Sequence, residues 1–423
     1  MRNPMKLLIG IGVFLFMQAI FTGVVLAETV VIGINDPAQD VKAVQDAVDK
    51  GGEILLKNIF DFGDKGSVTI SKDVKIVGER DSYGIPITKI KGGFRTFLSP
   101  LPAQLPPQAP GPKIAIQNIH FDESQMVPIY IAYSSGATIS GNKITNVRPF
   151  AASPQMNVSA GILVGTNWIQ PAATRKYQAG AVTGSIIIAG NDLDMSNDTP
   201  QKTLGQGIFV HWTTGSTLQI LANKVENCSR NSIEAMDNYL GDDGSGSVLI
   251  KDNYVVTPAV GVPFPSPRTP NGILAAWFFD GTGAGASNPK QNMKHTITNN
   301  TVRARGETSM GMWIGTNKAL VENNQITTEH KSANGIVINS AQCRILKNKI
   351  EGMGSAAIVI APNQSLTGSN NKCENNDVSS FKASLAEISL EKNSKNNIVV
   401  GSKGRAKDLG VDNKIKGLTR VKD

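Results

Sequence analysis

Residues 300–350 read NTVRARGETSMGMWIGTNKALVENNQITTEHKSANGIVINSAQCRILKNKI, and two short phrases alternate along them. Asn300, Asn324 and Asn348 lie 24 residues apart, and each begins a phrase Asn-x-Ile or Asn-x-Val. Between them stand two phrases of another kind, Gly-Met-Trp-Ile at 311–314 and Gly-Ile-Val-Ile at 335–338. A short repeat whose strands cannot bury their apolar faces alone is typical of a solenoid, in which stacked repeats share one core.

Both phrases recur along most of the chain. Asparagine phrases also begin at Asn142, Asn191, Asn223, Asn253, Asn376 and Asn413, and glycine phrases at Gly161, Gly207 and Gly272. Between Asn142 and Asn300 the spacings exceed 24 residues, which indicates loops inserted between strands. A length of 423 residues is compatible with several ordinary domains, but the repeat predicts one solenoid domain over residues 28–423.

The two ends of this domain differ from its middle. A strand is expected at 29–34, followed by a helix over 40–50 that Gly51-Gly52 ends. Val41, Val44 and Val48 share one face of that helix, so it can cover the open end of the first coil. A strand is expected to follow at 53–57. Residues 401–423 are rich in lysine and arginine, which suits a soluble C-terminal cap.

Residues 40–57, together with the Asn-x-Ile and Gly-Ile-x-Val repeats, give the chain a family resemblance. It resembles right-handed parallel β-helix proteins of the pectin-lyase-like superfamily over residues 30–415. The resemblance implies an all-β fold, a right-handed parallel β-helix with coils of roughly 24 residues. Polysaccharide lyases, glycoside hydrolases, uronate epimerases and proteins without known catalysis share this fold, so the fold does not assign an activity.

Residues 1–27 are expected to be a signal peptide. Arg2 and Lys6 precede an apolar run that extends to Leu26, and Val25-Leu26-Ala27 offers small residues for cleavage. The run is long, so an uncleaved anchor is the alternative. We expect an exported protein that is periplasmic, secreted or bound to the cell surface, with no stable membrane anchor once the signal is cleaved.

Charge and cysteine content narrow the partners. The net charge is +8, and it becomes +6 when Arg2 and Lys6 are removed. A basic exported protein attracts acidic polysaccharide, whereas the absence of basic segments interleaved with aromatic residues makes nucleic acid an unexpected partner. Three cysteines without metal-ligand spacing are expected to be small apolar fillers: Cys228, Cys343 and Cys373. The isolated His120, His295 and His330 are expected to be solvated.

Superposing the glycine phrases predicts which side chains point outward on neighbouring coils. The residue two after the glycine is outward, and this column contains Leu163, Phe209, Glu234, Leu274, Trp313, Val337 and Val359. Further along each phrase come His211, Trp212, Asp237 and Trp277. The long inserts at 147–160, 166–183, 196–206, 257–271 and 278–294 would enclose this stretch of sheet.

These residue types suit a sugar site. We expect Glu234, Asp237 and His211 to be the catalytic candidates, because two carboxylates can act as acid and base in glycoside hydrolysis. Alternatively, Glu234 or His211 removes a proton next to a uronate carboxylate. The expected substrate-binding residues are Phe209, Trp212, Trp277, Asp280, Trp313 and Arg268, since rings stack on sugars and arginine binds carboxylates. The competing interpretation is an ordinary solvated edge with the tryptophans packed under loops.

A second acidic group follows the asparagine phrases. Asp192, Asp194 and Glu226 are expected on adjacent coils, where like charges need neutralising. Calcium is one candidate for that role, and Lys224 or Lys143 is the favoured one. No cofactor is otherwise expected.

Two functions remain open at the level of sequence. One is an exported enzyme that binds and cleaves an acidic polysaccharide by lyase or hydrolase chemistry. The other is a non-catalytic carbohydrate-binding or adhesive protein. The motifs of pectin hydrolases and uronan epimerases are missing, and Asp242-Asp243 stands in a Gly/Ser-rich turn.

Overall fold

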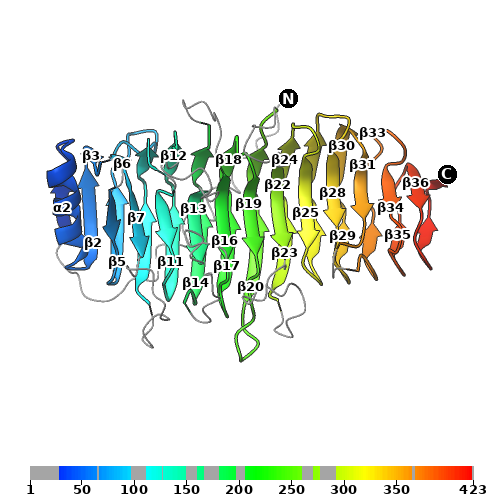
Figure 1. Ribbon diagram of the computed structural model, residues 1–423, viewed down its shortest axis with the longest axis horizontal. Helices are drawn as coiled ribbons and strands as arrows, with labels where there is room; N and C mark the ends of the chain where they lie inside the picture. Colours follow the sequence, from blue (N-terminus) through cyan, green and yellow to red (C-terminus); the bar gives the residue numbers. More distant parts are fainter. Residues whose placement is uncertain are drawn as a thin grey trace, which may run out of the picture.

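The computed structural model describes residues 28–63, 66–96, 111–125, 127–148, 160–165, 181–196, 205–259, 270–276, 292–363 and 367–421. Over these residues the chain winds through three parallel sheets in turn, and one coil follows another along a single axis (Figure 1). The expected all-β, right-handed parallel β-helix is confirmed, with α2 (Pro37–Val48) at the N-terminal end.

We call the three sheets A, B and C in the order in which the chain visits them. Among the described residues, sheet A consists of β1 (Thr29–Ile32), β2 (Gly52–Lys57), β5 (Val74–Gly78), β8 (Lys113–Gln117), β11 (Gly136–Ser140), β14 (Ser185–Ala189), β17 (Thr217–Leu221), β20 (Ser247–Lys251), β23 (Lys294–Thr298), β26 (Leu320–Glu322), β29 (Arg344–Leu346), β32 (Lys372–Glu374), β35 (Ile398–Val400) and β37 (Lys414–Lys416).

Within the same residues, sheet B consists of β3 (Ile59–Asp61), β6 (Lys89–Lys91), β9 (His120–Asp122), β12 (Lys143–Thr145), β15 (Asp192–Asp194), β18 (Lys224–Glu226), β21 (Tyr254–Val256), β24 (Thr301–Ala304), β27 (Gln325–Thr328), β30 (Lys349–Gly354) and β33 (Phe381–Ala383).

Sheet C contains the glycine phrases. Its described strands are β4 (Ser67–Thr69), β7 (Gly93–Thr96), β10 (Ile129–Ile131), β13 (Ala160–Gly165), β16 (Gln206–His211), β19 (Asn231–Met236), β22 (Asn271–Ala276), β25 (Met310–Gly315), β28 (Asn334–Ile338), β31 (Ala356–Ile360), β34 (Ile388–Leu390), β36 (Arg405–Asp408) and β38 (Thr419–Arg420). The basic residues from Lys403 to Arg420 therefore lie on the last two described coils of the stack.

The helix α2 begins three residues before the predicted start. Asp36 caps it by accepting hydrogen bonds from the backbone N–H groups of Ala38 and Gln39. Asp40 is buried and accepts from the backbone N–H groups of Ile34, Asp36 and Asp61, so its carboxylate joins the helix to the first coil. The predicted capping role is consistent with this position at the end of the stack (Figure 1).

A ladder of buried asparagines joins successive coils. The side-chain amide of Asn300 donates to Oδ1 of Asn324 at 3.0 Å, and Asn324 donates in the same way to Asn348 at 2.9 Å. The ladder runs through Asn142, Asn191, Asn223, Asn253, Asn300, Asn324, Asn348 and Asn376. From Asn191 onward, each Oδ1 also accepts the backbone N–H of the preceding ladder residue. These asparagines therefore have a structural role, since they join each coil to the next.

The structure adds two details about the asparagine phrases. The left-handed residue is the one before the ladder asparagine, as at Asn299 and Asn323 (φ 56° in both). Side-chain hydrogen bonding, and not tolerance of positive φ, therefore explains the ladder asparagine itself. Asn413 lies in a different ladder, because it accepts from Asn397 before a strand of sheet A.

The interior of the coils contains one unexpected polar residue. Cys228, Cys343 and Cys373 are buried fillers, as predicted, but His295 is also fully buried and not solvated. Its neighbour across the ladder is Val248. The ring Nδ1 lies 2.8 Å from the carbonyl oxygen of Met293, which accepts its hydrogen when the ring is neutral. Burial lowers the pKa of His295 to about 4.

We expect His295 to make folding sensitive to acid. In the unfolded chain a histidine has a pKa near 6.5, so that state gains a proton that the folded core excludes. The contribution of His295 is complete above pH 6.5 and falls by about 3 kcal/mol as the pH approaches 4. Urea unfolding of wild type and His295→Leu between pH 4 and 7 measures this slope. The half-buried His330 offers the control His330→Leu, and equal slopes in all three proteins would contradict the prediction.

Candidate functional site

The outer face of sheet C differs from those of sheets A and B. In β13, β16, β19 and β22 every residue is buried, on the outer as well as the inner side. In sheet A, β14, β17, β20 and β23 alternate between buried inner residues and accessible outer ones. One of the three faces is thus enclosed over four successive coils, and this face contains the predicted site.

The predicted outward column is confirmed by the strand register. Leu163 pairs with Phe209, Phe209 with Glu234 and Glu234 with Leu274, and the column continues through Trp313, Val337 and Val359. Apolar members of this face pack in a cluster of their own, separate from the interior core, that includes Tyr130, Leu163, Phe209, Met236 and Leu274. Glu234 is therefore a carboxylate placed among buried apolar neighbours.

Two side-chain amides hold the Glu234 carboxylate. Gln206 Nε2 and Asn231 Nδ2 donate to Oε2 of Glu234 at 3.0 and 2.8 Å. Asn231 in turn accepts from Asn271 Nδ2 at 2.9 Å. Glu234 is only 2 % exposed, and these bonds offset part of the cost of burying a carboxylate.

The amide residues were not among the predicted site residues. A sequence signal for them exists, since Gln206, Asn271 and Asn334 each stand immediately before the glycine of a phrase. Asn231 holds the same position in the coil of Glu234, where Ser232 replaces the glycine. The aligned phrases therefore reveal this column of amides. Only the structure shows that Gln206 and Asn231 donate to Glu234.

His211 and Asp237 form a buried pair beside this carboxylate. His211 Nε2 lies 3.1 Å from Asp237 Oδ2, and neither side chain is exposed. The His211 ring stacks on Phe209 at a centroid distance of 5.5 Å and lies 4.4 Å from the ring of Trp212. When His211 is neutral, the bond to Asp237 places its proton on Nε2.

The backbone at this pair adopts the left-handed conformation. Trp212 has φ 59° and Asp237 has φ 51°, and the two residues occupy equivalent positions on neighbouring coils. Positive φ is unusual for a bulky residue such as tryptophan and costs about 1–3 kcal/mol. Positive φ also recurs at the turns of other coils, as at Asn227, Asp252 and Asn323, so here it is a feature of the coil turn.

The structure brings some of the predicted residues together. Phe209, His211, Trp212 and Asp237 are in contact, whereas Glu234 makes its hydrogen bonds to Gln206 and Asn231. Trp313 is two positions along the column from Glu234, and its Nε1 donates to Oδ1 of Asn339. Trp277, Asp280, Arg268 and most of the long inserts lie outside the described residues.

The second acidic group is compensated by a lysine. Asp194 pairs with Glu226 on the adjacent coil, as predicted, and Asp192 pairs with Lys224. Lys224 Nζ lies 2.6 Å from Glu226 and 3.5 Å from Asp192, while Asn227 donates to Asp194. Within the described part of the chain, no group of three or more metal-binding side chains could hold an ion. Lys224 therefore contacts two of the three carboxylates, in the position expected for a neutralising lysine.

The coil architecture and the three parallel ladders define a parallel β-helix protein. Residues 279–415, about a third of the chain, match the family model described as a right handed beta helix region. No curated protein matches the chain in sequence. Among the described residues no helix is both long and apolar enough to cross a membrane.

Several solved structures share the architecture at low sequence identity. The Streptococcus pneumoniae surface protein and adhesin PfbA is 13% identical, with a TM-score of 0.49, over 92% of this chain and 100% of that one. The A-module of the Azotobacter vinelandii mannuronan C-5 epimerase AlgE4 is 11% identical, with a TM-score of 0.43, over 92% and 98%. A mutant of the PL6 family alginate lyase AlyGC is 15% identical, with a TM-score of 0.44, over 94% of this chain and 50% of that one. The function must therefore be argued from this chain's own side chains.

Proposed function

We propose that the protein is an exported carbohydrate-binding β-helix whose ligand, an acidic polysaccharide, lies along the outer face of sheet C. The observation that carries the proposal is the contrast between this face and the other two. Only here, among the described coils, are a carboxylate, a His–Asp pair and aromatic rings built into the outside of the solenoid. Aromatic rings with a few oriented polar groups are the usual composition of a sugar site.

Charge supports an acidic ligand. The chain carries 42 lysine and arginine residues against 34 acidic ones, so its long-range field attracts polyanions. The proposal requires no bound cofactor. A solenoid also presents a long face of equivalent positions, one coil about 4.8 Å from the next, which suits a polymer better than a small molecule.

Cleavage of the bound glycan is the second candidate function, and the His211–Asp237 pair is the observation that favours it. An aspartate that fixes the tautomer of a histidine is a common arrangement around a general base. Such a base could remove the proton next to a uronate carboxylate, and Glu234 is the remaining acid–base group. Both members of the pair are 0 % exposed, so cleavage requires a rearrangement that brings the pair into contact with the substrate.

A panel of uronate and neutral glycans tests both candidates. We expect wild type to bind a polyuronate in titration calorimetry, with an affinity that falls as salt is added. New reducing ends or unsaturated products would establish cleavage. In that case Glu234→Gln and Asp237→Asn are each expected to abolish turnover, since each removes an acid–base group and retains the size of the side chain. Full activity in both variants would exclude the catalytic assignment, and no binding to any glycan would exclude the proposed function.

A further inference from the structure

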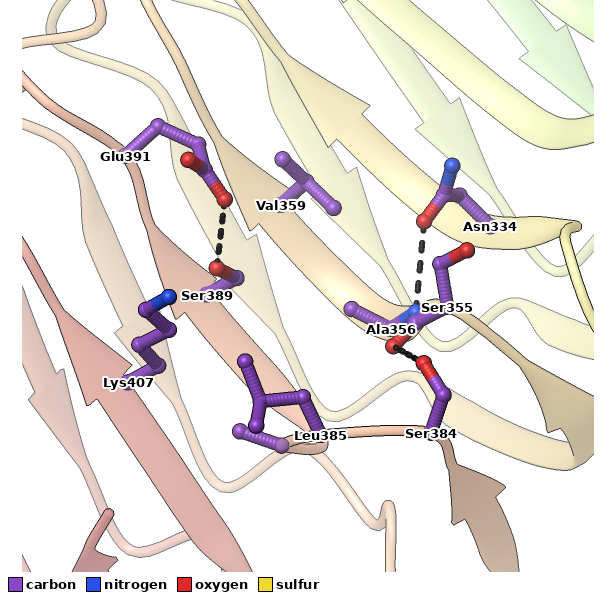
Figure 2. Close-up of a pocket in the computed structure, with 10 residues that line it drawn as sticks. Asn334, Ser355, Ala356, Val359, Ser384, Leu385, Ser389, Glu391 and Lys407 are labelled. Carbon is purple, nitrogen blue, oxygen red and sulfur yellow. Dashed lines mark hydrogen bonds between the residues drawn. The ribbon is translucent and has the colours of Figure 1, made fainter. Parts of the chain in front are cut away.

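A separate hollow opens on sheet C near the C-terminal end of the stack. It has a volume of ≈ 340 Å³ and is lined from β28, β31, β34, β36 and the turns between them. Figure 2 shows Asn334, Ser355 and Ser384 on one side, Ser389, Glu391 and Lys407 on the other, and Val359 between them. We call this hollow the C-terminal groove. Its volume falls within the range of about 300–1,000 Å³ that is typical of ligand sites.

The groove exists because the outward column of sheet C changes in size. Trp313 is followed on successive coils by Val337, Val359 and Ser389. The outward side chain shrinks from tryptophan to valine and then to serine along these coils. The surface therefore becomes hollow where the aromatic part of the column ends. Lys407 then follows Ser389 and closes the far side. The groove is thus the continuation of the column that contains Glu234.

The walls of the groove present both hydrogen-bond donors and acceptors. Asn334 Oδ1 accepts from the backbone N–H of Ala356 at 3.2 Å, which fixes the amide and leaves Nδ2 as a donor without a partner among the described residues. Ser389 donates to Oε1 of Glu391 at 2.6 Å, so that carboxylate is held in place with further lone pairs to offer. Val359 and Leu385 supply apolar surface between the two walls.

We propose that the C-terminal groove binds one pyranose unit of the same glycan that the proposed function places on sheet C. The inference rests on that function and adds a second point of contact. Glu391 accepts hydrogen bonds from sugar hydroxyls, Asn334 Nδ2 donates to them, and Val359 packs against the C–H face of the ring. Lys407 faces the carboxylate when the unit is a uronate.

The position of the groove fits a polymer that runs along the axis. Four coil steps separate Glu234 from Val359 in the column, which corresponds to about 19 Å at ~4.8 Å per coil. A chain seated in the groove and lying along sheet C can therefore also reach the coil that contains the buried Glu234. Two weak contacts on one polymer raise the overall affinity because the second forms at high effective concentration.

Titration calorimetry with polygalacturonate, alginate and a neutral glucan tests the groove. Val359→Arg fills it, and Glu391→Gln removes a charged acceptor while keeping the shape of the side chain. We expect each variant to bind the preferred glycan about tenfold more weakly, as for loss of one charged hydrogen-bonding group. The matched control is Glu374→Gln, on the outer face of sheet A, which should bind like wild type.

The outcomes separate the groove from the proposed function. If wild type binds a glycan and both groove variants bind it equally well, the groove inference is overturned and the proposed function stands. If wild type binds no glycan, the proposed function fails and the groove with it. Lys407→Gln distinguishes the ligand chemistry, since it should weaken binding of a uronate polymer and leave a neutral glucan unaffected. Glu391→Gln, which should fold normally by circular dichroism, keeps the test valid if Val359→Arg is unstable.

Discussion

Replacement of Asn324 by alanine is expected to lower the free energy of unfolding by about 4 kcal/mol, as estimated from the loss of several buried hydrogen bonds. Oδ1 of Asn324 accepts both the backbone N–H and the side-chain amide of Asn300. Its own amide donates to Asn348 and to the carbonyl of Ile297. Alanine removes these four bonds, although Oδ1 of Asn348 keeps the backbone N–H of residue 324. Each buried partner left without a bond costs about 1–3 kcal/mol where water cannot replace it.

Urea unfolding followed by circular dichroism measures this loss. The neighbouring Gln325 is exposed and points away from the core, so Gln325→Ala is the matched control and should change stability by no more than about 0.5 kcal/mol. Glycan affinity should be the same in wild type and Asn324→Ala at temperatures where both are folded. A stability loss no greater than that of the control, or a loss of affinity in the folded variant, would contradict the structural role of the ladder.

Replacement of Gly335 by alanine is expected to destabilise the fold by about 3 kcal/mol, at the upper end of the cost of overpacking. A Cβ at this position would lie 2.4 Å from the carbonyl oxygen of Ala357 and 2.6 Å from Cγ2 of Ile350. The first contact is with backbone that is part of the neighbouring coil, so relief requires a shift of the ladder itself. The glycine of the repeated phrase is therefore a packing requirement between coils.

Gly136 provides the control for this substitution. A Cβ there would meet only the carbonyl oxygen of Ser185, at 3.4 Å, which is close to ordinary van der Waals contact. Gly136→Ala should be neutral within about 0.5 kcal/mol, and the difference between the two variants should appear as a lower urea midpoint for Gly335→Ala. Similar midpoints would show that the coils can separate enough to admit a methyl group.

The fold and the outward column could be predicted from sequence because both depend on local periodicity. The 24-residue spacing specifies the coil, and alternation along a strand then determines that Phe209, Glu234 and Trp313 share one side. The same reasoning placed Asp194 beside Glu226. In each case the position of a residue within its own repeat is enough to predict which residue lies beside it on the next coil.

The parts that sequence could not supply depend on contacts between different coils. Alternation predicts that Glu234 points outward, but its burial and its amide donors depend on what lies over sheet C. His295 occupies an inward position that its residue type alone does not suggest. Asn413 repeats the local phrase yet belongs to another corner of the coil, because the phrase does not specify which turn it closes. The C-terminal groove results from side-chain sizes on four coils together, which no single repeat reveals.

The asparagine ladder also gives the solenoid a direction and a unit of length. From Asn142 to Asn348, each side-chain amide donates to the ladder asparagine of the next coil in chain order. A coil can be defined as the segment from one ladder asparagine to the residue before the next. Every such coil makes the same ladder hydrogen bonds to the coils on either side. Duplication or deletion of such a segment would change the number of coils, and so the reach of sheet C along a polymer, without leaving an amide unmatched. The length of the proposed binding face can thus change in steps of one whole coil.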